Sequence, residues 1–140
     1  MENKEIIIDA ENSVVGRLAS FVAKKALQGN RVTVLNSERA IIIGKRSIIV
    51  NRYIQKRQLG RGVQKGPNMP SRSDMILRRM IRGMLPWHRT IGREAFKLIY
   101  CYKGIPEKYK NKEKDFLKLE TKNALNYIKI QDISKALGKS

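Results

Sequence analysis

Apolar residues near the start of the chain follow two different spacings. Residues 6–8 are three consecutive isoleucines, a run typical of a short buried strand. A polar stretch then ends at Ser13, which we expect to cap a helix, and Gly29 is expected to end that helix. Between them apolar residues recur with the spacing of one helical face, namely Val15, Leu18, Ala19, Val22, Ala23, Ala26 and Leu27.

Three further apolar runs predict strands. Residues 31–36 are rich in β-branched side chains, residues 40–43 are apolar up to Gly44, and residues 98–102 form a last run. Buried apolar strands joined through a helix are typical of a parallel sheet that is covered on both faces. The pattern therefore predicts an α/β fold.

An α/β fold raises the possibility of a bound nucleotide at the carboxyl ends of the strands. The segment after the first strand, residues 9–16, has neither the GxGxxG nor the GxxxxGK[ST] spacing of a phosphate-binding turn. Asp9 and Glu38 follow strands, but two carboxylates alone give little support to acid–base catalysis. We therefore expect no cofactor, no small-molecule substrate and no catalytic residue.

The middle of the chain predicts a helix followed by an irregular loop. Residues 47–58 form the expected helix, with Ile48, Ile49 and Tyr53 partly inward. Residues 59–70 contain three glycines and two prolines, which excludes regular structure there. A basic loop of this length in a compact domain indicates a functional role or ordering by a partner.

The next helix, expected to begin at Ser71 or Ser73, has two opposite arcs. One arc is apolar and consists of Ile76, Leu77, Met80, Ile81 and Met84. The other carries four arginines within about one third of the circumference: Arg72, Arg78, Arg79 and Arg82. Since few acids are near enough to pair with them, an arginine face that meets only solvent is the less favoured interpretation.

Three residue types that often carry chemistry occur once each. Trp87 follows Pro86, which is expected to end the arginine-bearing helix before a short helix over residues 92–97; we favour core packing of this tryptophan over stacking on a base. His88 and Cys101 are too few for a zinc site or a catalytic dyad, and a single cysteine cannot form an intramolecular disulfide. A reducing cytoplasm fits this cysteine content best.

Net charge says more about the binding partner than any other property of the sequence. The chain of 140 residues has 30 Lys and Arg against 12 Asp and Glu, a formal net charge of +18. Residues 45–97 hold fourteen of the basic residues and only two acids. Such an excess requires a polyanionic partner, and a nucleic acid is favoured over a membrane because the apolar runs are only strand-length.

We therefore predict a nucleic-acid-binding region at residues 45–97. Its candidate contact residues are the basic side chains of that segment: Lys45, Arg46, Arg52, Lys56, Arg57, Arg61, Lys65, Arg72, Arg78, Arg79, Arg82, His88, Arg89, Arg93 and Lys97.

Several motifs in the chain have a specific content and spacing. The most specific is residues 81–86 (IRGMLP), then five residues, Gly92-Arg93, five more, and residues 99–104 (IYCYKG). Further motifs are Asp9-Ala10, residues 16–20 (GRLAS), residues 34–36 with Glu38, Ile43-Gly44, residues 65–67 (KGP) and residues 70–72 (PSR). Together they resemble the L thirteen family of large-subunit ribosomal proteins, over about residues 6–109.

Details of the resemblance point to one branch of the family. Residues 104–106 (GIP) with Tyr109 resemble the archaeal and eukaryotic form rather than the bacterial one. Cys101 stands where a small aliphatic residue is expected, a change that a strand tolerates. The segment after Lys110 matches no pattern of the family.

The resemblance implies a three-layer α/β/α fold with a four-stranded parallel sheet, no catalytic activity and no cofactor. It also implies binding to large-subunit ribosomal RNA early in assembly, with neighbouring ribosomal proteins as partners in the cytoplasmic ribosome. We expect one domain over residues 1–140, with an α/β core at about 5–104 and a charged C-terminal extension at 105–140. No membrane attachment, metal or homo-oligomer is expected.

Two other classes of function remain open at this point. An α/β enzyme acting on a nucleotide or RNA would be stabilised by a nucleotide. A basic DNA-compacting protein would bind duplex DNA as well as structured RNA, whereas a ribosomal protein should prefer A-form helices or junctions.

Overall fold

The computed structural model describes residues 4–59, 69–111, 117–118 and 126–138. Three parallel strands form the central sheet: β1 (Glu5–Asp9), β2 (Arg31–Leu35) and β4 (Ile99–Cys101). β2 lies between the other two, and β5 (Leu117–Lys118) pairs in parallel with the end of β1 over two residues. The predicted α/β fold and its last strand, within residues 98–102, are confirmed.

One face of the sheet is covered by three helices. These are α1 (Val15–Leu27), α3 (Ser73–Gly83) and α4 (Thr90–Lys97), with α1 in contact with both of the others. The strand residues beneath them include Ile8, Val32, Val34 and Ile99, all fully buried. Because side chains alternate along a strand, the neighbouring residues face the opposite side.

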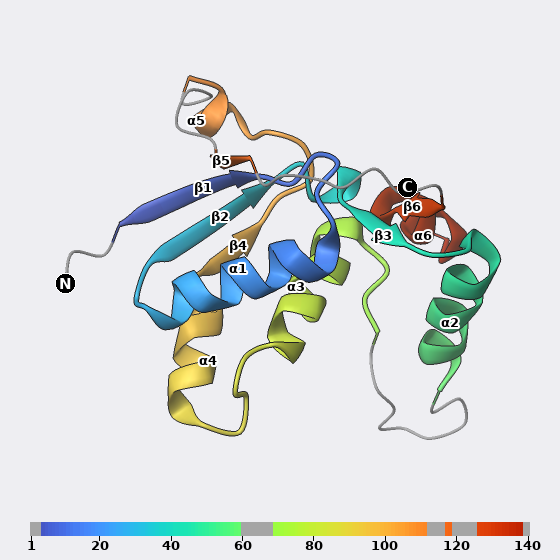
Figure 1. Cartoon of the computed structure of the whole chain (residues 1–140), viewed down its shortest axis with the longest axis horizontal. Helices are drawn as coiled ribbons and strands as arrows, with labels where there is room; N and C mark the ends of the chain where they lie inside the picture. The colour runs from blue at the N-terminus through green and yellow to red at the C-terminus, as the bar shows by residue number, and fades with distance from the viewer. Residues whose placement is uncertain (1–3, 60–68, 112–116, 119–125, 139–140) are drawn as a thin grey trace.

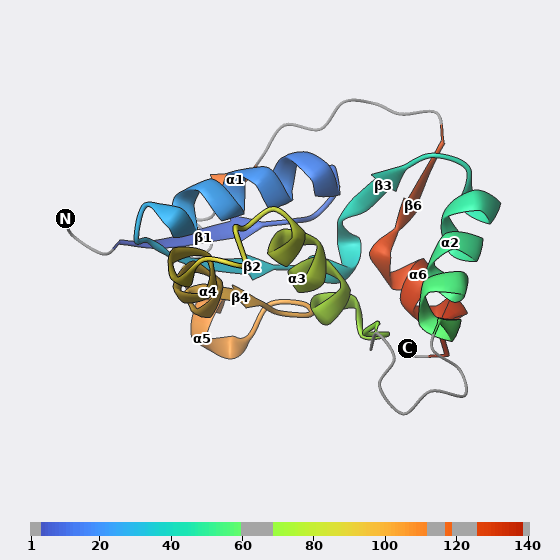
Figure 2. The ribbon, with the colours of Figure 1, turned by 90° about the horizontal axis from the view of Figure 1, so that it is seen from below.

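The opposite face of the sheet is more polar. Ile7 and Leu35 pack there against Tyr109 of the short helix α5 (Glu107–Lys110). The Tyr109 hydroxyl donates to the carboxylate of Glu5 at 3.1 Å, and the Thr33 hydroxyl reaches the same oxygen at 3.3 Å. Figure 2 shows α1 and α5 on opposite sides of β1 and β2.

A second group of elements lies beside the carboxyl ends of β1 and β2 (Figure 1). It consists of β3 (Ile41–Ile43), α2 (Arg46–Gln58), β6 (Tyr127–Lys129) and α6 (Ile130–Ala136). β3 pairs in an antiparallel manner with β6 and takes no part in the parallel sheet. The expectation that residues 40–43 join that sheet is therefore wrong: the chain turns at Asn36 (φ +55°) into a 3₁₀ turn, η1 (Ser37–Arg39), which leads β3 away.

The C-terminal residues contribute to the main core. Ile128, Ile130 and Ile133 are fully buried and belong to the same apolar cluster as Ile8 and Leu77. α6 contacts both α2 and α3, and the Ser134 hydroxyl donates to the carbonyl of Ser71 at 2.7 Å. The description of residues 105–140 as a charged extension is thus wrong for β6 and α6, whose apolar residues fill the space between helices.

Two smaller sequence predictions also differ from the structure. Val14, not Ser13, is the N-cap of α1, and no side chain caps it; the Ser13 backbone instead accepts from Ile41. Ile48 is 54% exposed, so of the three residues expected to turn inward only Ile49 and Tyr53 are buried. The apolar face of α1 is confirmed from Val15 to Ala26.

Candidate nucleic-acid interface

The predicted basic residues lie in two groups. The first is on and before α2, and the second runs from Arg72 through α3 and α4 to Lys97. Arg61 and Lys65 lie outside the described residues. Nearly all side chains of the two groups are exposed, the exceptions being Arg78 and Arg82, which are half-buried.

The α2 group is held by the apolar residues of its own helix. Ile49 and Tyr53 are buried, which leaves Lys45, Arg46, Arg52, Lys56 and Arg57 on the exposed sides. Burial raises the pKa of the Tyr53 hydroxyl, an effect partly offset by the positive charge of Arg52. The Lys56 ammonium lies 5.5 Å from the Tyr53 ring, a cation–π arrangement.

A hydrogen bond joins the end of α2 to the segment before α3. Nη1 of Arg57 donates to the carbonyl oxygen of Met69 at 3.2 Å. Arg57 and Met69 are therefore close together although they are twelve residues apart in the chain. Arg57 thus has a structural partner as well as an exposed side chain.

The arginine-bearing helix α3 has the predicted apolar arc over most of its length. Ile76, Leu77 and Ile81 are fully buried and Met80 is half-buried, whereas Met84 at the C-cap is 46% exposed. The opposite arc is not uniform. Arg79 is exposed to solvent, but Arg78 and Arg82 each lie against an aromatic ring.

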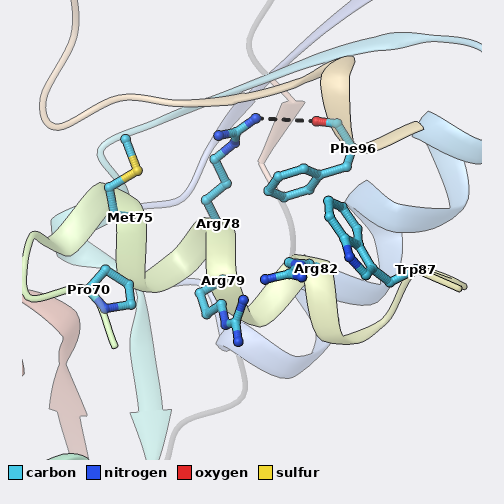
Figure 3. Close-up of a pocket in the computed structure, with 7 residues that line it drawn as sticks. All are labelled: Pro70, Met75, Arg78, Arg79, Arg82, Trp87 and Phe96. Carbon is cyan, nitrogen blue, oxygen red and sulfur yellow. Dashed lines mark hydrogen bonds between the residues drawn. The ribbon is translucent and has the colours of Figure 1, made fainter. Parts of the chain in front are cut away.

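Arg78, Phe96, Trp87 and Arg82 form a continuous Arg–aromatic stack (Figure 3). The Arg78 guanidinium lies 4.1 Å from the Phe96 ring centre, and its Nη2 donates to the Phe96 carbonyl at 3.4 Å. Trp87 meets Phe96 edge-on, with ring centres 5.1 Å apart and planes at 86°. The Arg82 guanidinium lies 3.9 Å from the Trp87 ring centre. The favoured packing role of Trp87 agrees with this contact to Phe96.

An open cavity of about 410 Å³ borders the Arg–aromatic stack. Its walls are the four residues of the stack, the exposed side chain of Arg79, and Met75 and Pro70. Three of the lining residues are cationic and none is acidic. The sequence interpretation did not include Met75 or Phe96; their apolar positions on α3 and α4 are the only signal that would have pointed to them.

The turn between α3 and α4 is held by Arg93. Its Nε donates to the carbonyl of Trp87 at 2.9 Å, and its Nη2 donates to the carbonyl of His88 at 3.4 Å. Part of the hydrogen-bonding capacity of this predicted contact residue is therefore used within the chain. His88, Arg89 and Lys97 are exposed on or beside the same turn and helix.

Asp74 is an acidic residue in the first turn of α3, close to the arginines of that helix. Its carboxylate, 8% exposed, pairs with Arg72 at 3.0 Å and accepts from the Met75 backbone at 3.0 Å. Burial raises the pKa of the nearby Cys101 thiol to about 12; the positive charge of Arg78 opposes this shift and the negative charge of Asp74 adds to it. Arg72 is thus partly neutralised, whereas Arg78 and Arg82 contact aromatic rings.

The carboxylates at the strand ends serve the fold. Asp9 Oδ1 accepts from the Asn36 amide at 3.0 Å and from the Glu11 backbone at 3.0 Å, and Glu38 Oε2 accepts from the Gly104 backbone at 2.9 Å. These bonds tie together the loops that follow β1, β2 and β4. Within the part of the chain that the structure describes, no group of three or more His, Cys, Asp or Glu side chains is arranged to hold a metal, and no helix is long and apolar enough to cross a membrane.

Comparison with known proteins identifies the family. A sequence model of ribosomal protein L13 matches residues 3–108. The chain belongs to this family. Ribosomal protein L13 is a structural ribosomal protein and not an enzyme, in agreement with the predicted lack of a catalytic role.

Similar proteins come from archaea, and each is named large ribosomal subunit protein uL13. The protein of Methanopyrus kandleri is 54% identical over 100 residues, which cover 71% of this chain and 62% of that protein. Those of Methanococcus maripaludis and Methanocaldococcus jannaschii are 40% and 41% identical, over 95% and 94% of this chain and 97% and 96% of their own lengths. The L13 resemblance inferred from the motifs is therefore confirmed.

Proposed function

We propose that this L13 chain is a structural constituent of the large ribosomal subunit, where it binds large-subunit ribosomal RNA and helps the subunit assemble at an early stage. It works in the cytoplasm as part of the ribosome. The L13 family carries the assignment to the ribosome. The placement of exposed cations on α2, α3 and α4, with few acids near them, carries the assignment of the RNA-binding side.

The basic residues of 45–97 act together in this proposal. Arg and Lys neutralise phosphates where RNA helices converge, and Arg also binds phosphate through two parallel hydrogen bonds. Arg79, His88, Arg89 and Lys97 are exposed on or between α3 and α4, and the exposed cations of α2 form a second basic group. The apolar cores beneath these helices hold the cations in place.

The remaining features of the protein follow from the same role. One domain over residues 1–140 provides the platform, and pairing of β5 with β1 extends its sheet to four strands. Packing of α5 against Ile7 and Leu35 supplies a partial third layer. Its partners are ribosomal RNA and neighbouring ribosomal proteins, with no membrane, small molecule or second copy of the chain required.

Salt dependence of binding tests the proposed function. The full-length protein should bind large-subunit ribosomal RNA tightly at low salt, and its affinity should fall steeply as salt increases because counterions are released from the phosphates. An affinity that stayed flat between low and high salt would contradict this mechanism. Co-migration of the protein with large subunits after a moderate salt wash is the matching observation in cell extract.

A competition experiment separates this function from DNA compaction. Structured ribosomal RNA should displace labelled RNA from the protein at much lower concentration than duplex DNA of equal length. Equal competition by the two would favour general binding to polyanions. An enzyme that uses Asp9 and Glu38 for acid–base catalysis is disfavoured, since both carboxylates are engaged in backbone and amide hydrogen bonds.

A further inference from the structure

We propose that the cavity beside the Arg–aromatic stack receives a single unstacked nucleotide of RNA. The proposal rests on the proposed binding of ribosomal RNA and adds a site and a mode of recognition to it. The base would lie against the guanidinium planes and aromatic rings of the stack, and Arg79 would meet the phosphate. The family and the net charge support RNA binding but do not indicate where a base is held.

The lining chemistry matches an unpaired base. Bases outside a helix are recognised in proteins by stacking on aromatic rings and on Arg guanidinium planes. Here the Arg82 guanidinium lies over the Trp87 ring at 3.9 Å, so one of its faces is already occupied by a ring. In Figure 3 this guanidinium lies between Trp87 and Arg79. A base on the free face would lengthen a stack that the protein has already ordered.

The stack is held in place before any RNA arrives. Phe96 is clamped between the Arg78 guanidinium and the edge of Trp87, and Arg78 also donates to the Phe96 carbonyl. Arg93 fixes the backbone of Trp87 and His88. Because these side chains are already ordered, binding a base there loses less conformational entropy than ordering free arginines would.

The size and charge of the cavity select among possible occupants. About 410 Å³ falls within the roughly 300–1,000 Å³ range of small-ligand sites, which suits one nucleotide and excludes a helix. Met75 and Pro70 give apolar walls for the base or ribose, whereas three arginines and no acids line the site. A side chain from a neighbouring protein would need to be anionic to satisfy these cations, and RNA supplies both a flat ring and a charge in one unit.

Trp87 makes the test direct, because it is the only tryptophan in the chain. The full-length protein is titrated with large-subunit ribosomal RNA at low salt while Trp87 fluorescence and RNA affinity are followed together. We expect the fluorescence to be quenched in step with binding, since a base would stack within the Arg–aromatic stack that contains this ring.

Two methionine variants provide a matched pair. Met75→Glu places a carboxylate in the cavity wall, and Met84→Glu places the same charge on an exposed methionine at the other end of α3 that does not line the cavity. Both are checked for an unchanged unfolding temperature. We expect Met75→Glu to weaken RNA binding on the order of tenfold more than Met84→Glu, the size of a lost base-stacking contact, and to abolish the quenching.

Ultraviolet cross-linking in intact large subunits identifies the occupant. A nucleotide adduct on the tryptic peptide 83–89, which contains Trp87, supports the proposal. A cross-link from this peptide to another ribosomal protein instead of RNA overturns it. Binding of the wild-type protein with no quenching, together with equal effects of the two variants, also overturns it and leaves RNA binding by the protein intact. Failure of the wild-type protein to bind RNA at low salt would instead contradict the proposed function.

Discussion

Gly92 in the first half of α4 lies directly against the carbonyl oxygen of Pro86. A Cβ atom at this position would overlap that oxygen and would also lie 3.1 Å from the Pro86 ring. The same carbonyl accepts a hydrogen bond from the Arg89 backbone at 3.0 Å, which closes the turn that carries Trp87 and His88. This close approach explains why glycine stands at position 92.

Gly92→Ala should therefore shift this turn and destabilise the protein by about 1–3 kcal/mol, the usual effect of overfilling a packed site. Urea unfolding measures this change. Gly83→Ala is the control, because a Cβ at Gly83 meets nothing within 4 Å; it should leave stability unchanged or raise it by up to about 1 kcal/mol. Equal stability of the two variants would show that the turn moves freely to make room.

Local patterns predicted α1, β2 and α3 because each of these elements carries its own signal. The apolar face from Val15 to Ala26 has helical spacing, and residues 31–35 are mostly β-branched and apolar. Similarly, three of the five residues predicted for the apolar arc of α3 are buried. In these elements burial follows from the order of residues in one segment, so no knowledge of distant segments is required.

Pairing between distant segments could not be predicted in the same way. Residues 41–43 are three isoleucines, a run that fits either a parallel or an antiparallel sheet. Their partner, β6, lies more than eighty residues further on, within a sequence of mixed charge. The buried residues of β6 and α6 are separated by polar ones over too short a length for a clear period.

The candidate interface was predicted in location but not in detail. Charge counting places the cations at residues 45–97, yet it treats all arginines alike. Arg78 and Arg82 differ from Arg79 because Phe96 and Trp87, which come from a later turn and helix, cover their guanidinium planes. That difference depends on tertiary packing, which the spacing of arginines on one helix does not contain.

The core role of α6 gives a second prediction. Ile133 is fully buried among residues of the main cluster. Ile133→Ala should destabilise the protein by about 2–5 kcal/mol, through lost apolar contact and the remaining cavity. Lys135→Ala, an exposed position on the same helix, should change stability by less than about 0.5 kcal/mol. Similar small effects in thermal or urea unfolding for both variants would mean that the C-terminal helix is not part of the cooperative core.

Cys101 gives a prediction about pH. Burial raises the pKa of this thiol from near 9 to about 12 in the folded protein, so the unfolded chain ionises first as pH rises. Stability from this group is fully present below pH 9 and is lost progressively between pH 9 and 12. A thiol reagent such as a disulfide dye should therefore fail to react with the native protein at pH 8 and should react fully in denaturant.

The variant Cys101→Ala separates the effect of the thiol on stability from the effect of lysine and tyrosine ionisation. Cys101→Ala should be less stable than the wild type by about 1 kcal/mol at pH 7, because it loses packing. That deficit should shrink between pH 9 and pH 10.5, since alanine has no thiol to ionise. A deficit that stayed constant, or rapid labelling of the native protein at pH 8, would contradict the burial of this side chain.

Arg78 and Arg79 are neighbours on α3 with opposite expected phenotypes. The Arg79 side chain is exposed, so Arg79→Ala should leave the free energy of unfolding within about 0.5 kcal/mol of wild type and should weaken RNA binding. Arg78 packs on Phe96 and donates to its carbonyl, so Arg78→Ala should destabilise the protein by about 1–3 kcal/mol. Arg78→Lys retains the charge but not the flat guanidinium, so it should recover only part of the lost stability.

Arg78, Arg79 and Arg82 do not share one environment, since Arg79 is exposed and the other two are half-buried. The triple alanine variant should lose stability as well as RNA affinity, because two of its three side chains cover aromatic rings. Urea unfolding and RNA titration of the single variants separate the two effects. If Arg78→Ala proved as stable as Arg79→Ala, the Arg–aromatic stack would contribute nothing to the fold, and a base entering the cavity would meet side chains that were still free to move.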